Sequence, residues 1–146
     1  MKRFLKEELD NYLSGRSNEG KKENTFINCN RAYQWYYKGS LILYGLQDLI
    51  GHEAMDSALR SFNQEFGLKQ TPPFPGSYDL YRHLEAVTPD SIKYYLDDTW
   101  NKITLYDNKA EEVQAKRISD GEYEITLKIK SQKLYADETG KEENAK

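Results

Sequence analysis

Residues 119–130 read Ser-Asp-Gly-Glu-Tyr-Glu-Ile-Thr-Leu-Lys-Ile-Lys, and this stretch decides the fold class. Apolar and polar residues alternate strictly in it, which is the pattern of a strand with one buried face. The apolar positions are Tyr123, Ile125, Leu127 and Ile129. Ser119-Asp120-Gly121 is a tight-turn signature, and residues 113–118 supply the opposite strand. A lone hairpin is marginal in water, so its apolar face predicts partner strands beyond this sequence.

Before residue 100 the apolar spacing is helical instead. We expect helices near residues 4–13, 31–50, 52–66, 77–87 and 89–100. Gly15, Gly51 and Gly67 would end the first three, and Thr88-Pro89-Asp90 is the strongest start signal in the chain. The helix over 31–50 has little polar surface and should form the buried centre of the fold.

These patterns predict an α+β chain, a bundle of about five helices followed by a β-hairpin that begins a truncated β-sandwich. We expect the helical part to cover residues 1–100 and the first strands of a β domain to cover 101–135. The charged residues 136–146 should be disordered.

The composition of the chain argues against several classes of function. The chain has 146 residues, a net charge of -3 and 38% hydrophobic residues. Its lack of a basic excess argues against nucleic-acid binding. No apolar run of about 18 residues is present, so we expect a soluble segment without a membrane span. The first residues lack the apolar region of a signal peptide.

Most residues that could carry chemistry have a simpler structural interpretation. We expect His52 and His83 on polar helix surfaces and Cys29 as an inert thiol without a basic neighbour. The adjacent acidic pairs point apart and make poor catalytic dyads. With one cysteine and two histidines, the chain offers no set of metal ligands.

The segment from Tyr33 to Gly39, Tyr-Gln-Trp-Tyr-Tyr-Lys-Gly, has two open interpretations. It is either the aromatic beginning of a buried helix or a functional element. Phenols stay protonated at neutral pH and can therefore donate a hydrogen bond to an oxyanion. Gly39, the last residue of this segment, would let the backbone pack closely.

The same segment carries a family resemblance. Tyr36-Tyr37-Lys38-Gly39-Ser40, with residues 41–51, resembles the Y-x-K-G helix of zinc aminopeptidases related to membrane alanyl aminopeptidase. Residues 4–16, 88–91 and 103–108 are similar to further blocks in the same order. The likeness is to bacterial members whose peptidase domain is joined to a transporter-permease-like membrane region. It implies that Tyr36 is catalytic and stabilises the tetrahedral intermediate at the scissile carbonyl.

The resemblance also has a large gap. The H-E-x-x-H motif of the family occurs nowhere in this sequence. Family order therefore implies that zinc belongs to an upstream part of a parent protein, with no cofactor in this chain. The partners implied are that upstream part and a peptide substrate. The fragment would be inactive alone, its parent would be associated with the bacterial cell membrane, and no substrate-binding or metal-binding residue is assigned.

A different class of function remains open beside the peptidase. Trp35, Tyr36, Tyr37 and Tyr44 would form the aromatic surface of a non-catalytic helical module that binds protein or peptide. The open strand edge of the hairpin also predicts that copies of the chain could pair as a homo-oligomer.

Overall fold

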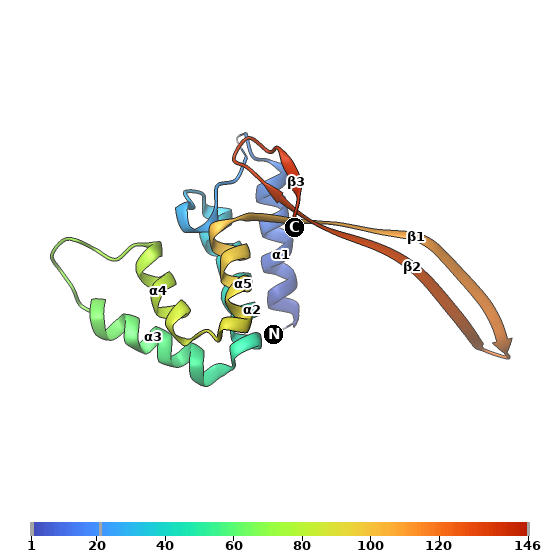
Figure 1. The fold of residues 1–146 in the computed structure, drawn as a ribbon, viewed down its shortest axis with the longest axis horizontal. Helices are drawn as coiled ribbons and strands as arrows, with labels where there is room; N and C mark the ends of the chain where they lie inside the picture. The colour runs from blue at the N-terminus through green and yellow to red at the C-terminus, as the bar shows by residue number, and fades with distance from the viewer. Residues whose placement is uncertain (1, 21, 146) are drawn as a thin grey trace.

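The computed structural model describes residues 2–20 and 22–145, which form a helical body and a long two-stranded arm (Figure 1). Met1, Lys21 and Lys146, which fall within the ranges predicted above, lie outside the described residues. Among the described residues, five α-helices precede a three-stranded antiparallel sheet, so the predicted α+β class is confirmed. The helices are α1 (Lys2–Ser17), α2 (Gly39–Ile50), α3 (His52–Phe66), α4 (Ser77–Val87) and α5 (Lys93–Leu96).

The hydrophobic core lies where α2, α3, α4 and α5 meet. Its fully buried members are Leu46, Ala58, Leu84 and Leu96, and Trp100 is only 2% exposed. Phe26, in the short 3-10 turn η1 (Phe26–Asn28), closes the core with its ring edge against Trp100. The core is small because most of the amphipathic helices contribute one or two side chains each.

The first helix does not end at Gly15 as predicted. It continues to Ser17, and Gly15 packs against the ring of Tyr33. A Cβ atom at Gly15 would contact Cβ of Tyr33 and approach its Cγ to 2.6 Å. The glycine therefore serves a close approach between two segments rather than a helix stop.

The predicted helix over residues 89–100 is a series of short turns. Thr88 belongs to the end of α4, because its hydroxyl donates to the carbonyl of Leu84 at 2.7 Å. The 3-10 turn η3 (Asp90–Ile92), α5 and the π-helix η4 (Asp97–Asn101) then follow one another. Pro89 precedes this series of turns. The tertiary contacts of Leu96 and Trp100 determine how the helical pitch changes along it.

The arm consists of β1 (Ile103–Ser119) and β2 (Glu122–Ala136), joined by Asp120 and Gly121. Gly121 has a φ of 80°, which the predicted tight turn requires. The sequence pattern marked residues 113–118 as the partner strand, whereas β1 begins ten residues earlier, within the range 101–135 expected for the first strands. Polar residues 107–109 extend it by pairing with 130–132, although their side chains have little strand propensity.

The tail was expected to be disordered, and the structure differs. The carboxylate of Asp137 accepts hydrogen bonds from the amides of Thr139 and Lys141, at 2.8 and 3.0 Å. This turn directs the chain back, and β3 (Glu142–Asn144) pairs with residues 134–136 of β2. Local hydrogen bonds from the backbone to a side chain thus order a segment whose composition alone predicted disorder.

No helix within residues 2–20 and 22–145 combines the length and the apolar character that crossing a bilayer needs.

Candidate functional site around Tyr36

Tyr36 lies on an exposed π-helical turn at the surface of the body. This turn, η2 (Tyr33–Lys38), runs directly into α2. The Tyr36 side chain is 66% exposed, and its ring stands beside those of Trp35 and Tyr37 at centroid distances of 6.3 and 6.5 Å. Within the described ranges, no residue hydrogen-bonds to the Tyr36 hydroxyl. The predicted site residue is therefore accessible to another molecule.

The π turn η2 has one buried side and one exposed side. The amide of Gly39 donates to the carbonyl of Gln34, five residues earlier. Gln34 is fully buried and its side-chain amide donates to the carbonyl of Asn24 at 3.0 Å. Single π turns occur frequently at functional sites. Here the anchored Gln34 fixes the turn, while Trp35 and Tyr36 remain outside.

An apolar hollow of about 380 Å³ opens next to Tyr36. Besides Tyr36, its lining includes the apolar side chains Phe26, Trp35, Leu43, Leu80 and Trp100. Gly39 also lines the hollow, and a Cβ atom there would approach the Phe26 ring to 3.2 Å. The hollow therefore combines a hydroxyl at its edge with a surface that suits apolar side chains of a bound chain.

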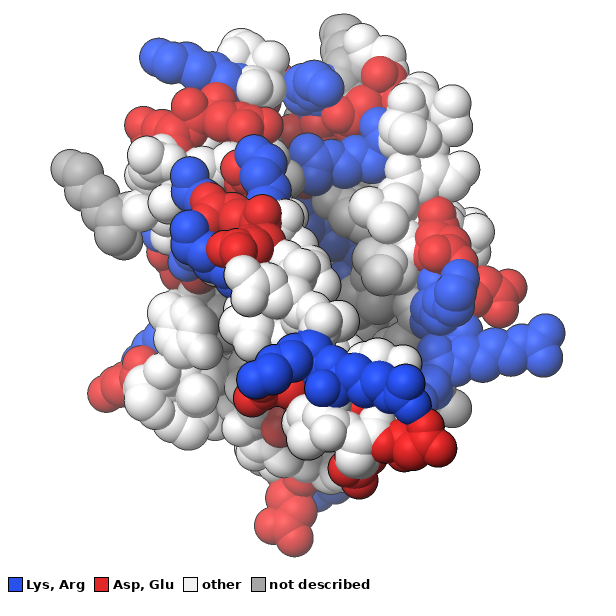
Figure 2. Space-filling view, turned by 90° about the vertical axis from the view of Figure 1, so that its right-hand side faces the viewer, with Lys and Arg blue, Asp and Glu red and all other residues white. Residues whose placement is uncertain are grey.

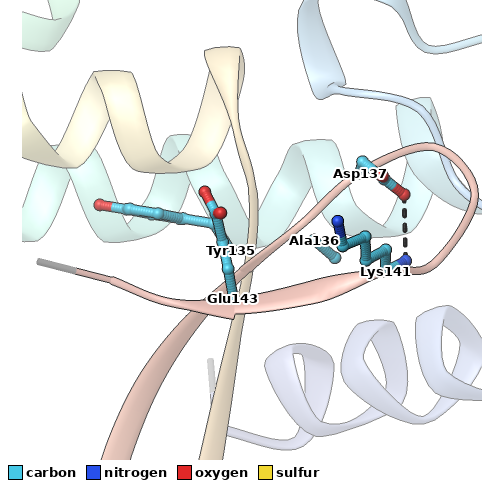
Figure 3. A pocket seen from close by; sticks show the side chains of 5 residues that line it. All are labelled: Tyr135, Ala136, Asp137, Lys141 and Glu143. Atoms are coloured by element: carbon cyan, nitrogen blue, oxygen red, sulfur yellow. Dashed lines mark hydrogen bonds between the residues drawn. The ribbon is translucent and has the colours of Figure 1, made fainter.

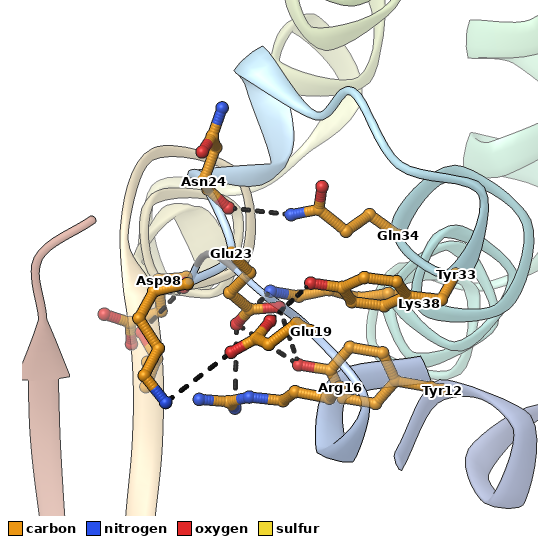
Figure 4. A network of polar contacts seen from close by, with 11 residues as sticks. Tyr12, Arg16, Glu19, Glu23, Asn24, Tyr33, Gln34, Lys38 and Asp98 are labelled. Carbon is orange, nitrogen blue, oxygen red and sulfur yellow. Dashed lines mark hydrogen bonds and ion pairs between the residues drawn. The ribbon is translucent and has the colours of Figure 1, made fainter. Parts of the chain in front are cut away.

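A buried carboxylate holds the rest of the motif in place (Figure 4). Glu23, only 2% exposed, accepts a hydrogen bond from Tyr12 at 3.0 Å and from Lys38 at 3.3 Å. The guanidinium of Arg16 lies 3.6 Å from the same carboxylate. Lys38 thus faces inward and connects η2 with α1 through Glu23. The pKa of Tyr12 is raised, first by burial and then by the charge of Glu23.

A second tyrosine joins this network from η2. Tyr33 donates to the carboxylate of Glu19 at 2.7 Å, as Figure 4 shows. Burial and this hydrogen bond raise the pKa of Tyr33. Both phenols therefore stay protonated and hold the loop between α1 and η2 to the body. The sequence pattern gave no signal for this network, because its members come from α1, from the segment that follows it and from η2.

His83 is the clearest difference from the expected surface positions. It is 8% exposed, and its Nδ1 and Nε2 atoms lie 3.0 Å from Ser61 and 3.1 Å from Glu65. Phe62 and Phe66 place their rings nearly perpendicular to the imidazole. Ser61 and Glu65 are four residues apart on α3, so they meet one side chain of α4. The histidine therefore joins two helices.

The candidates His52 and Cys29 lie apart from each other, and Cys29 lines the apolar hollow beside Tyr36. His52 is exposed at the start of α3, and Cys29 is half-buried with its pKa raised by burial. No three His, Cys, Asp or Glu side chains of residues 2–20 and 22–145 are grouped to hold a metal ion. The zinc that the resemblance implies therefore has no fitting ligand set in the described part of the chain.

A polar hollow of about 240 Å³ lies at the tail turn, away from Tyr36 (Figure 3). Tyr135, Asp137, Lys141 and Glu143 line it together with Ala136. The hydrogen bonds of the turn itself occupy the Asp137 carboxylate. This hollow is a consequence of the turn geometry and contains no further grouping of catalytic side chains.

Comparisons with protein families, with curated proteins and with solved structures found no match for this chain.

Proposed function

We propose that this chain is the C-terminal part of a zinc aminopeptidase catalytic domain, followed by the start of its β domain. The observation that carries the proposal is the exposed Tyr36 with an uncommitted hydroxyl beside an apolar hollow. In this proposal, Tyr36 and the hollow form one wall of the peptide cleft. The zinc ligands and the general base belong to an upstream part of the parent protein.

The role proposed for Tyr36 follows from phenol chemistry. A protonated hydroxyl can donate a hydrogen bond to the oxygen of a scissile carbonyl as negative charge develops there. A donor that is already positioned costs little reorganisation in the transition state. The anchored π turn supports such positioning, because Gln34 and Lys38 hold it from within the body.

The two other residues of the motif have physical roles in this fold that agree with the proposal. Lys38 is 14% exposed and paired with Glu23, so it orients the helix rather than meeting a substrate. Gly39 permits the close approach of Phe26. Both residues therefore support the geometry of the Tyr36 turn. In the parent we further propose a membrane region of the transporter-permease kind.

The test replaces one hydroxyl in the complete parent protein. Tyr36→Phe should lower kcat by about 10²–10³-fold, the usual effect of removing one oxyanion donor. Its zinc content and melting temperature should remain unchanged. Tyr37→Phe is the matched control, because it removes a neighbouring phenol that lines a different surface hollow. Unaltered turnover of the Tyr36→Phe enzyme would refute the assignment.

The apolar hollow also favours a second candidate, a peptide-binding module without catalysis. Trp35 and Tyr36 are 46% and 66% exposed at its edge, and such aromatic residues often anchor interfaces. The coding sequence upstream separates the two candidates. An intact H-E-x-x-H supports the peptidase, whereas replaced histidines there favour the binding module.

A further inference from the structure

The outer edge of β2 is an open and regular strand edge. β3 pairs with residues 134–136 of it and the amide of Ala145 donates to the carbonyl of Lys133, which leaves 122–132 without a neighbour on that side among the described residues. Both irregularities of the hairpin fall on β1, which inserts Glu111 and Ile118 while β2 continues in step. Bulges protect a strand edge against pairing, so β1 is the protected edge and β2 is the one open to addition.

The free edge of β2 has a charge pattern that complements itself. Glu122 and Glu124 lie on one side of Thr126, and Lys128 and Lys130 lie at the same spacing on the other side. Antiparallel pairing of two β2 strands about Thr126 would therefore place each acid opposite a base. The resulting pairs are Glu122 with Lys130 and Glu124 with Lys128, each formed twice.

The same register also matches the apolar face of the arm. It places Tyr123 opposite Ile129 and Ile125 opposite Leu127, all on one side of the sheet. These four side chains are 54–65% exposed. Cross-strand neighbours of this kind stabilise a sheet, and each of them has a neighbour on only one side in a single copy.

The shape of the molecule permits this arrangement. The arm projects away from the helical body, so a second arm can lie along it without the two bodies meeting (Figure 1). The paired stretch 122–130 ends before the residues that β3 covers. Seen from the side toward which the arm points, positive and negative side chains are interspersed, with no single-sign field to repel a second copy (Figure 2).

We propose that the chain forms a two-fold symmetric dimer through antiparallel β2–β2 pairing centred on Thr126. The product is a continuous four-stranded sheet in the order β1-β2-β2-β1. The occupant of the edge is thus a second copy of this chain.

Charge reversal tests the register by sedimentation of the full chain. Glu122→Lys/Glu124→Lys and Lys128→Glu/Lys130→Glu should each be monomeric at concentrations where the unaltered chain is dimeric. An equimolar mixture of the two variants should restore a dimer that contains one copy of each. A monomeric unaltered chain, as expected if a strand of a longer polypeptide is the natural occupant, would overturn the proposal. A dimer that neither variant weakens would overturn it as well.

A control variant separates edge pairing from damage to the hairpin. Glu112→Lys/Lys116→Glu changes the pairs between β1 and β2 that the charge reversals on β2 also change. Glu112 lies opposite Lys128, and Lys116 lies opposite Glu124. It leaves the edge of β2 unchanged and should still dimerise. Circular dichroism of all the variants shows whether the hairpin remains folded.

A crosslink tests the position of the two-fold axis. In a Cys29→Ser background, Thr126→Cys should form an intermolecular disulfide on mild oxidation, because paired residues on adjacent antiparallel strands lie about 4.5–5.5 Å apart at Cα. Gln114→Cys is the matched control, since Gln114 faces Thr126 across the hairpin on β1. Equal crosslinking at the two positions would contradict the proposed axis.

Discussion

At the scale of single residues, Glu23 shows how much of this fold depends on one buried carboxylate. It accepts hydrogen bonds from Tyr12 and Lys38, which belong to α1 and η2. A buried ion pair adds little by itself, but removing one partner leaves the other charge without compensation. The carboxylate therefore contributes to stability mainly because its removal would leave Lys38 and the Tyr12 hydroxyl without a partner.

Glu23→Ala should lower the free energy of unfolding by about 3 kcal/mol, because Lys38 and the Tyr12 hydroxyl would lose their acceptor. Urea denaturation followed by circular dichroism measures the change. Glu7→Ala is the control, since Glu7 is exposed on α1 and should alter stability by less than about 0.5 kcal/mol. Equal effects of the two substitutions would show that the network contributes nothing.

Tyr95 makes the stability of the folded chain depend on pH in the alkaline range. Burial raises its pKa from 10.0 to about 12, and its hydroxyl donates to the carbonyl of Ile42 at 3.0 Å. The folded chain thus holds this proton more tightly than the unfolded chain does. Its contribution is complete below pH 10 and should be lost as the pH rises through about 12.

Tyr95→Phe should lower stability at pH 8 by about 1 kcal/mol, the usual contribution of one hydrogen bond. The same variant should lose less stability than the unaltered chain when the pH increases from 10 to 12. Denaturation curves at several pH values measure both effects. Tyr106→Phe, at an exposed position on β1, should leave both unchanged. Identical alkaline slopes for Tyr95→Phe and the unaltered chain would contradict the assignment.

At the scale of elements, α3 and α4 are joined by one histidine and an aromatic pair. Both helices have clear amphipathic patterns, and their existence could be predicted from sequence alone. The contact of His83 with Ser61 and Glu65 could not be predicted in this way. The spacing of polar residues along one helix does not indicate which residues of another helix they contact. The interhelical angle brings it inward, and hydrogen bonds at both ring nitrogens make its burial tolerable.

His83→Ala should destabilise the chain by about 2 kcal/mol, because it removes two hydrogen bonds and the packing of Phe62 and Phe66. His52→Ala, at an exposed site, should change stability by less than about 0.5 kcal/mol. Thermal unfolding of the pair measures the difference. A small effect at both positions would mean that the two helices pack without this contact.

At the scale of the whole molecule, the body and the arm differ in how they are stabilised. Residues 108–131 have exposed side chains throughout, whereas α2 buries Ile42 and Leu46 in the core. The base of the arm is attached through Asp98, which accepts hydrogen bonds from Lys133 and Tyr135. Beyond that attachment, the hairpin relies on its own ladder and turn.

Amide hydrogen exchange should therefore be much faster in the arm than in α2 when the chain is monomeric. The Glu122→Lys/Glu124→Lys variant provides that monomeric state. Mass spectrometry of proteolytic peptides can compare residues 108–131 with those around Leu46. Equal protection of the two regions in this variant would show that the arm is stabilised by contacts other than its own hairpin.

The sequence by itself determined that a helical body precedes a β-hairpin and that Gly121 lies in its tight turn, because hydrophobic period and backbone freedom are local properties. It also marked Tyr36 as the candidate, although its role remains a prediction. Tertiary structure alone decided that Gly15 lies within a helix and that Glu23 and His83 are buried. These outcomes depend on residues distant in the chain, whose contacts override local preference.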